Sequence, residues 1–201
     1  PKDTWIVGGA LPEQMAVSRD ALWVAYSASN QVQSFSIAEN GALSAGAMFR
    51  TGMNPYDLVV SPDGRRVYVA ERLGEHITVI DTEGGTTQRV LVGDVSGGEF
   101  PATDAELGEA FNFVTAPFTV DGDQACVECH REGGNLARHH TMPLQQDRVW
   151  GTRMIQAYRS AMDTRPWFLE TAMDEANFFP VINEFNRKEN FCCEGIDTLV
   201  W

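Results

Sequence analysis

The chain has 201 residues, of which 43% are hydrophobic and 21% are charged, and these fractions exclude wholesale disorder. Fifteen basic and 28 acidic residues give a net charge of −13, which argues against nucleic acid or an anionic membrane as partner, because both require basic surface. No apolar run is long enough for a membrane span, and the length allows one ordinary domain or two small ones.

Residues 1–100 have the composition of short β-strands. Runs rich in β-branched and aromatic residues occupy positions 15–17, 22–26 and 32–37, and Asn, Gly and Ser separate them. The same order of residues returns after 43 to 45 positions. Residues 12–17 align with 55–60, and Trp23-Val24-Ala25 aligns with Tyr68-Val69-Ala70 after a slip of two. A repeat of this length with three or four strands is typical of a β-propeller blade.

This stretch resembles YVTN-type β-propellers. The resemblance depends on Asn54-Pro55-Tyr56-Asp57, Ser61-Pro62-Asp63-Gly64, Val67-Tyr68-Val69-Ala70 and Ile77-Thr78-Val79-Ile80-Asp81. It implies about two blades within residues 1–100, too few to close a ring. We therefore expect the remaining blades to come from the same longer polypeptide or from another chain. A small antiparallel sandwich is the alternative fold.

A different periodicity begins beyond a boundary at residues 98–103. Thr103 and Glu106 have the spacing of a capping box, and the residues that follow repeat at helical spacing. We therefore predict a multi-domain chain, in which an all-β partial propeller (1–100) precedes a mainly α domain (101–201). The first expected helical face has the apolar residues Leu107, Ala110 and Phe111, and the second has Met154, Ile155, Tyr158 and Met162. A third helix is expected to start near Trp167.

The pentapeptide Cys126-Val127-Glu128-Cys129-His130 is the strongest chemical signal in the chain. Cys-x-x-Cys-His attaches haem c: two thiols one helical turn apart suit the two vinyl groups of one porphyrin, and the histidine is the proximal iron ligand. A zinc site would need two more ligands, for which His139 or His140 could serve. A redox dithiol would need a βαβ context, which the sequence lacks.

The order of motifs around this pentapeptide, over about residues 104–190, resembles the first haem domain of bacterial di-haem cytochrome c peroxidases and their methylamine-utilisation relatives. The matching pieces are Leu107-Gly108-Glu109-Ala110-Phe111, Phe118-Thr119-Val120-Asp121-Gly122, the pentapeptide, Arg153 and Pro166-Trp167-Phe168. The chain departs from the family at Trp167-Phe168-Leu169-Glu170, where the family has Trp-Asp-Gly-Arg, and in having no second Cys-x-x-Cys-His.

The resemblance implies a secreted redox protein, periplasmic or extracellular, with one haem c in this chain and a second haem domain outside it. Calcium is a further candidate cofactor. The function of the protein would be reduction of hydrogen peroxide or oxidation of a partner, with a redox partner protein as electron donor or acceptor. The alternatives are an electron-transfer cytochrome with a propeller docking module and no small-molecule substrate, or a scaffold with a structural haem.

The resemblance also assigns roles beyond the pentapeptide. Trp167 matches the tryptophan that relays electrons between the haems, and a core aromatic is its alternative. Glu184 matches a distal acid that moves protons between peroxide oxygens, and Asn177 is a candidate polar neighbour; for Glu184 the alternative is a solvated surface residue.

Other residues are candidates to bind the iron at its sixth position or to bind the haem carboxylates. His139, His140 or Met142 could be the sixth ligand, with Met154 as a rival, although exposed histidines and core methionines are common. Arg153 suits a haem propionate, because a guanidinium binds a carboxylate through two hydrogen bonds. The adjacent Cys192 and Cys193 cannot easily bridge each other, and we expect partners outside this chain in an oxidising compartment.

Overall fold

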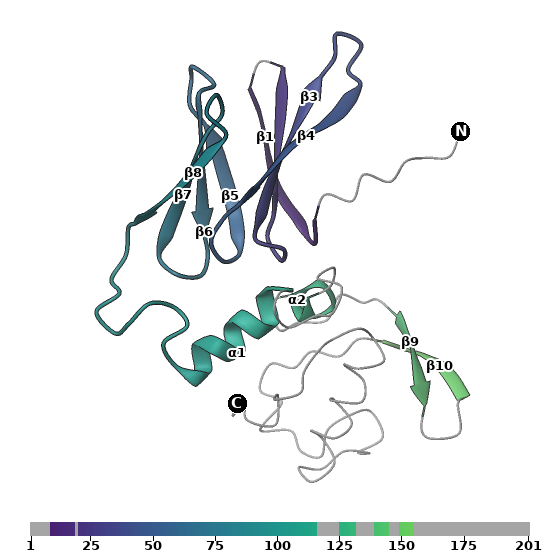
Figure 1. The fold of residues 1–201 in the computed structure, drawn as a ribbon. Coiled ribbons are helices and arrows are strands. Elements are labelled where there is room, and N and C mark those ends of the chain that lie inside the picture. Colours follow the sequence, from purple (N-terminus) through teal and green to yellow (C-terminus); the bar gives the residue numbers. More distant parts are fainter. Residues whose placement is uncertain (1–8, 19, 116–124, 132–138, 145–148, 155–201) are drawn as a thin grey trace.

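The computed structural model describes residues 9–18, 20–115, 125–131, 139–144 and 149–154. Two four-stranded antiparallel sheets make up most of this part, and each follows the chain order from one strand to its neighbour (Figure 1). The first sheet contains β1 (Pro12–Ser18), β2 (Ala21–Tyr26), β3 (Gln31–Ile37) and β4 (Leu43–Arg50). The second contains β5 (Pro55–Val60), β6 (Arg66–Glu71), β7 (His76–Asp81) and β8 (Thr86–Leu91). The prediction of two β repeats is confirmed, and the sheets are consistent with partial β-propeller blades.

The sequence repeat is visible in the backbone of both sheets. The pairing of the first two strands shifts at the same place in each sheet, between Pro12 and Gln14 and between Pro55 and Asp57. Each sheet is also preceded by a residue with positive φ at the same repeat position, Leu11 in one and Asn54 in the other. The first strands lie side by side, and the Gln14 Nε2 donates a hydrogen bond to the Asp57 Oδ1 over 3.2 Å. The repeat is therefore a repeat of geometry as well as of letters.

The main core lies between the two sheets. Each sheet contributes one apolar face, because alternate residues of a strand point to opposite sides. Trp23 and Phe49 lie 5.8 Å apart between ring centroids at the centre of the first face. The buried members of the core are Trp23, Ala25, Val32 and Phe49 from the first sheet and Leu58, Val67, Val69 and Ile80 from the second.

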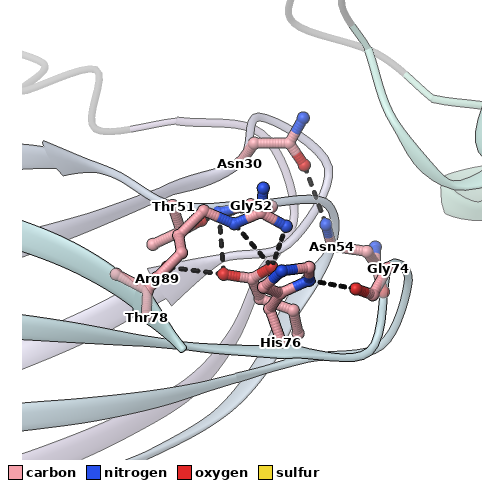
Figure 2. A network of polar contacts seen from close by, with 9 residues as sticks. Asn30, Thr51, Gly52, Asn54, Gly74, His76, Thr78 and Arg89 are labelled. Carbon is pink, nitrogen blue, oxygen red and sulfur yellow. Dashed lines mark hydrogen bonds and ion pairs between the residues drawn. The ribbon is translucent and has the colours of Figure 1, made fainter. Parts of the chain in front are cut away.

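A buried carboxylate beside this core joins the second sheet to the link that connects it with the first. The side chain of Glu71, at the end of β6, has no solvent exposure. It accepts hydrogen bonds from the backbone N–H of Gly52, over 3.0 Å, and from the hydroxyl of Thr78. The Arg89 guanidinium forms an ion pair with its other oxygen at 2.9 Å, and Figure 2 shows Gly52, Thr78 and Arg89 converging on this point. Because Gly52 belongs to the link between β4 and β5, the carboxylate fixes the step from one sheet to the next.

A helix follows the second sheet, as the capping box predicted. α1 (Asp104–Phe113) begins after Thr103, whose side chain accepts from the Glu106 N–H while the Glu106 carboxylate accepts from the Thr103 N–H. Ala110 and Phe111 are its buried residues. The helix therefore starts where the sequence indicated and buries two of the three predicted apolar positions.

The rest of the described chain differs from the mainly α prediction. After the short α2 (Cys126–Cys129) come β9 (His139–Leu144) and β10 (Val149–Met154), which pair as an antiparallel hairpin. The expected helical position of Met154 is therefore wrong. Pro143 disfavours a helix here, and Thr141, Val149, Trp150 and Thr152 favour extended backbone. No helix within the described ranges is long and apolar enough to cross a membrane.

Candidate haem-attachment site

The Cys-x-x-Cys-His pentapeptide forms a single closed helical turn. Ala125 precedes the turn in extended conformation, and its N–H donates to the Glu128 carboxylate over 2.9 Å. At the other end, the His130 N–H donates to the Cys126 carbonyl over 2.9 Å. Positions 126 and 129 consequently lie one turn apart on an α-helix, with His130 at its C-terminal end.

The turn rests on the first sheet through its apolar residues. Ala125 and Val127 are buried, 3% and 4% exposed, in a cluster with Ala10, which precedes β1, and Ala28, which lies in the turn between β2 and β3. Cys126 is half-buried. On a helical turn, position 127 lies about 100° from position 126, so Cys126 lies to one side of the buried contact.

The segment before the turn is fixed at the junction of the two sheets. Thr115 donates to the Ala28 carbonyl from both its N–H, over 2.8 Å, and its hydroxyl, over 3.2 Å. The Asn54 amide donates to the carbonyls of Ser27, over 3.3 Å, and of Phe113, over 3.4 Å. Asn54 is fully buried, and its own N–H donates to the Asn30 side chain over 2.8 Å, as Figure 2 shows. One asparagine therefore connects both sheets and the end of α1.

Two arginines line a small cleft between the sheets and the turn. The Arg131 guanidinium lies 3.9 Å from the Glu13 carboxylate. The Arg72 guanidinium lies over the rings of Tyr56 and Phe113, with its central carbon 5.4 Å and 5.2 Å from their centroids. The residues that line the cleft are Leu11, Glu13, Arg72, Phe113, Val127 and Arg131. None of them was predicted as a site residue. Two features of the sequence could have indicated a place beside the turn. Arg131 directly follows His130, and Glu13 and Tyr56 occupy the same position of the repeat.

The structure places the other predicted haem residues on the hairpin. Arg153 of β10 pairs with His140 of β9, and His139 pairs with Met154. Met142 pairs with Gly151. The backbone thus brings Arg153 and the two histidines to one end of the hairpin. Within the described ranges, no three His, Cys, Asp or Glu residues gather as a metal site.

The remaining predicted site residues lie outside the described residues. They are Trp167, Asn177 and Glu184, together with the cysteine pair Cys192 and Cys193. Their assigned roles stay predictions.

Comparison with known proteins gives weak structural likenesses. No family model and no curated protein matches the chain. A functionally unknown protein from Desulfotomaculum acetoxidans is 24% identical, with 42% of this chain and 29% of that one covered, at a TM-score of 0.38. Hydrazine synthase from Kuenenia stuttgartiensis is 19% identical, with coverage of 47% and 27%, also at 0.38. The periplasmic gluconolactonase of Pseudomonas aeruginosa is 17% identical, with coverage of 73% and 40%, at 0.32. The chain spans less than half the length of each of these proteins, and likenesses at this level assign no family.

Proposed function

We propose that this chain belongs to a haem c redox protein. Cys126 and Cys129 would bind the haem through thioether bonds, and the His130 imidazole would be the proximal ligand of its iron. The observation that carries the proposal is the conformation of the pentapeptide, in which positions 126 and 129 lie one helical turn apart and His130 follows directly. This spacing matches two vinyl groups and an iron ligand of one porphyrin.

The surroundings of the turn fit such a group. Val127 and Ala125 bury the side of the turn that faces the sheet, while Cys126 stays half-buried. Backbone N–H groups at both ends of the helical turn donate hydrogen bonds that close it, so positions 126, 129 and 130 have a fixed arrangement. When bound, haem c supplies one-electron redox chemistry. The chain's own contribution is to hold the turn, orient His130 and support both on the sheets.

We propose further that the redox reaction is peroxidase-like, either reduction of hydrogen peroxide or oxidation of a partner protein. The order of motifs over residues 104–190 supports this assignment. It requires a second haem domain and further blades, from the same or another chain, and a periplasmic or extracellular location. In this assignment Glu184 moves protons between the peroxide oxygens, Trp167 relays electrons, and Asn177 is a polar neighbour.

Haem attachment is tested by mass measurement under denaturing conditions. We expect any peptide that contains both Cys126 and Cys129 to carry the mass of one haem, because thioether bonds survive denaturation. The variants Cys126→Ser and Cys129→Ser should each lose one covalent link. Cys192→Ser, outside the motif, is the matched control and should leave attachment unchanged. A peptide mass without haem, or zinc in place of haem, would reject the proposal.

Peroxide turnover by the intact protein tests the finer assignment. Glu184→Gln should slow peroxide cleavage by about 100-fold or more, because a positioned general acid–base typically contributes that much. Trp167→Phe should slow electron transfer between haems and leave haem attachment intact. A single haem that is six-coordinate and inert to peroxide would instead favour the electron-transfer cytochrome.

A further inference from the structure

Several residues at equivalent repeat positions differ in chemistry where the two sheets meet α1 and the turn. In the middle of the strands the repeat conserves residue type, as Trp23 corresponds to Tyr68 and Ala25 to Ala70. At the end nearest α1 and α2 the repeat breaks. The residues at the shift in β1 and β5 are Glu13 and Tyr56, which occupy the same repeat position and differ in chemistry. The residue that follows β6 is Arg72, whereas its counterpart after β2 is Ser27.

Glu13 and Arg72 each contact the segment that carries the pentapeptide, and Tyr56 contacts Arg72. Glu13 lies 3.9 Å from Arg131, the first residue after the motif. Tyr56 lies under the Arg72 guanidinium, which also lies over the ring of Phe113, the last residue of α1. Three residues that differ from their repeat equivalents thus belong to the surface that meets the haem-attachment segment.

Arg72 is well placed to connect the second sheet to the end of α1. Its backbone N–H donates to the Asn54 carbonyl over 2.9 Å, which fixes the base of the side chain. Its guanidinium reaches two rings from different elements, Tyr56 of β5 and Phe113 of α1. Within the described ranges it has no salt bridge, so its position depends on the rings and on the backbone. Phe113 in turn packs against the cluster that holds Ala125 and Val127.

We propose that Arg72 is a positioning residue for the haem-attachment turn. Its guanidinium clamps the end of α1 to β5, and Phe113 transmits that constraint to the residues on either side of Cys126. The plane of the guanidinium suits two aromatic faces in a way that the ammonium of lysine does not. That the turn carries haem rests on the function proposed above, whereas the contact of Arg72 with Tyr56 and Phe113 exists in the polypeptide without haem.

Hydrogen exchange of the full chain tests the clamp with or without haem. Arg72→Lys keeps the charge and loses the planar contact, and Arg72→Met keeps the aliphatic stem and loses both. We expect amides at residues 113–115 and 125–130 to exchange roughly 5- to 30-fold faster in both variants, as the loss of two cation–π contacts implies. Arg65→Lys is the matched control, because Arg65 forms an exposed salt bridge with Glu83 between two turns of the second sheet.

The location of the change decides between a clamp and general stability. Exchange in β6 and β7 should stay at its original rate in the Arg72 variants. Unchanged exchange at 125–130, or equal acceleration throughout both sheets, would overturn the proposal. These results do not depend on haem, so a chain that carries no haem and still shows the clamp would reject the proposed function alone.

The haem-loaded protein gives a second readout that a purely structural residue would not move. If Arg72 orients the turn that carries His130, the reduction potential should shift in both Arg72→Met and Arg72→Lys, because both lose the planar contact, and should stay unchanged in Arg65→Lys. A potential unchanged in both Arg72 variants would show that Arg72 does not orient the haem ligand.

Discussion

Buried polar side chains decide how the two sheets meet. Glu71 satisfies Gly52, Thr78 and Arg89 together, and Asn54 reaches Ser27 and Phe113 from a backbone with φ of 55°. Asparagine tolerates this left-handed conformation better than most residues do. A buried polar group without its partners costs about 1 to 3 kcal/mol, so these groups specify one arrangement of the sheets.

Replacing Glu71 should destabilise the junction in a graded way. Glu71→Ala leaves the Gly52 N–H, the Thr78 hydroxyl and the Arg89 guanidinium without their acceptor, and we expect a loss of about 2 to 4 kcal/mol in the free energy of unfolding. Glu71→Gln keeps one acceptor oxygen and should lose about half as much. Urea denaturation measures both values.

The matched control for this series is Glu83→Gln. Glu83 forms a salt bridge with Arg65 in which the two side chains are 70% and 67% exposed. Its loss should therefore change the free energy of unfolding by less than about 0.5 kcal/mol. A Glu71→Ala variant as stable as that control would show that the carboxylate does not hold the sheets together.

The site residues that could be predicted from the sequence are those whose partners are near in the chain. The hydrogen bonds that shape the pentapeptide lie within residues 125–130, and its spacing alone identified the turn. Arg72 and Phe113 are 41 positions apart, and only the fold brings them together. Arg72 differs from its repeat equivalent Ser27, but other positions such as Glu71 and Tyr26 differ as well, so the repeat did not single out this contact.

Local signals also explain which elements were predicted correctly. The capping box of α1 involves residues three apart, so Thr103 and Glu106 located the start of the helix. The hairpin of β9 and β10 was missed because spacing around Met154 matched a helical period. Pairing between the two strands, together with Pro143 and several β-branched residues, outweighed that short pattern. Periodicity over few residues does not distinguish these outcomes.

The start of α1 should depend on pH through Glu106. Hydrogen bonds from the Ala102 N–H, then from Thr103, hold the pKa of the Glu106 carboxyl below its ordinary value of 4.5. A lowered pKa in the folded state means that the charged form stabilises the helix start at neutral pH. That contribution is fully present above pH 4.5 and is lost as the pH falls through the lower folded value.

Hydrogen exchange or helical circular dichroism across this range measures the effect. Glu106→Gln keeps a capping side chain but cannot titrate, so its helix start should show no such pH dependence. Thr103→Ala removes the reciprocal bond and should fray the first turn at every pH, at a cost of about 1 kcal/mol. An unchanged pH profile in Glu106→Gln would show that another group titrates there.

The two sheets together have the geometry of consecutive members of a series. One face of the first sheet covers Leu58, Val67, Val69 and Ile80 of the second sheet. The second sheet has an equivalent face, which includes Tyr68 and Val90, and this face points away from the core. This arrangement could be predicted, because the alternation of apolar and polar residues along each strand and the repeat of 43 to 45 residues are both visible in the sequence. How the series continues could not be predicted from residues 1–100, because it depends on sheets elsewhere.

The last prediction concerns the uncovered face of the first sheet. Met15 and Leu58 occupy the same repeat position, yet Met15 is 67% exposed and Leu58 is 4% exposed. If a further blade packs on the first sheet as the first packs on the second, Met15 becomes buried. We expect Met15 in the assembled protein to resist a mild oxidant and to react only after unfolding, as peptide masses would show.

A matched probe makes the result interpretable. Leu58→Met places a methionine at the equivalent covered position, and a swap of similar volume should cost less than about 1.5 kcal/mol. Met15 and the methionine introduced at position 58 should then oxidise at similarly low rates, because the same kind of interface covers both. Oxidation of Met15 at the rate of the unfolded chain, with position 58 protected, would mean that no further blade covers this face. The first sheet would then be the end of the series, and its apolar outer residues would need a different partner.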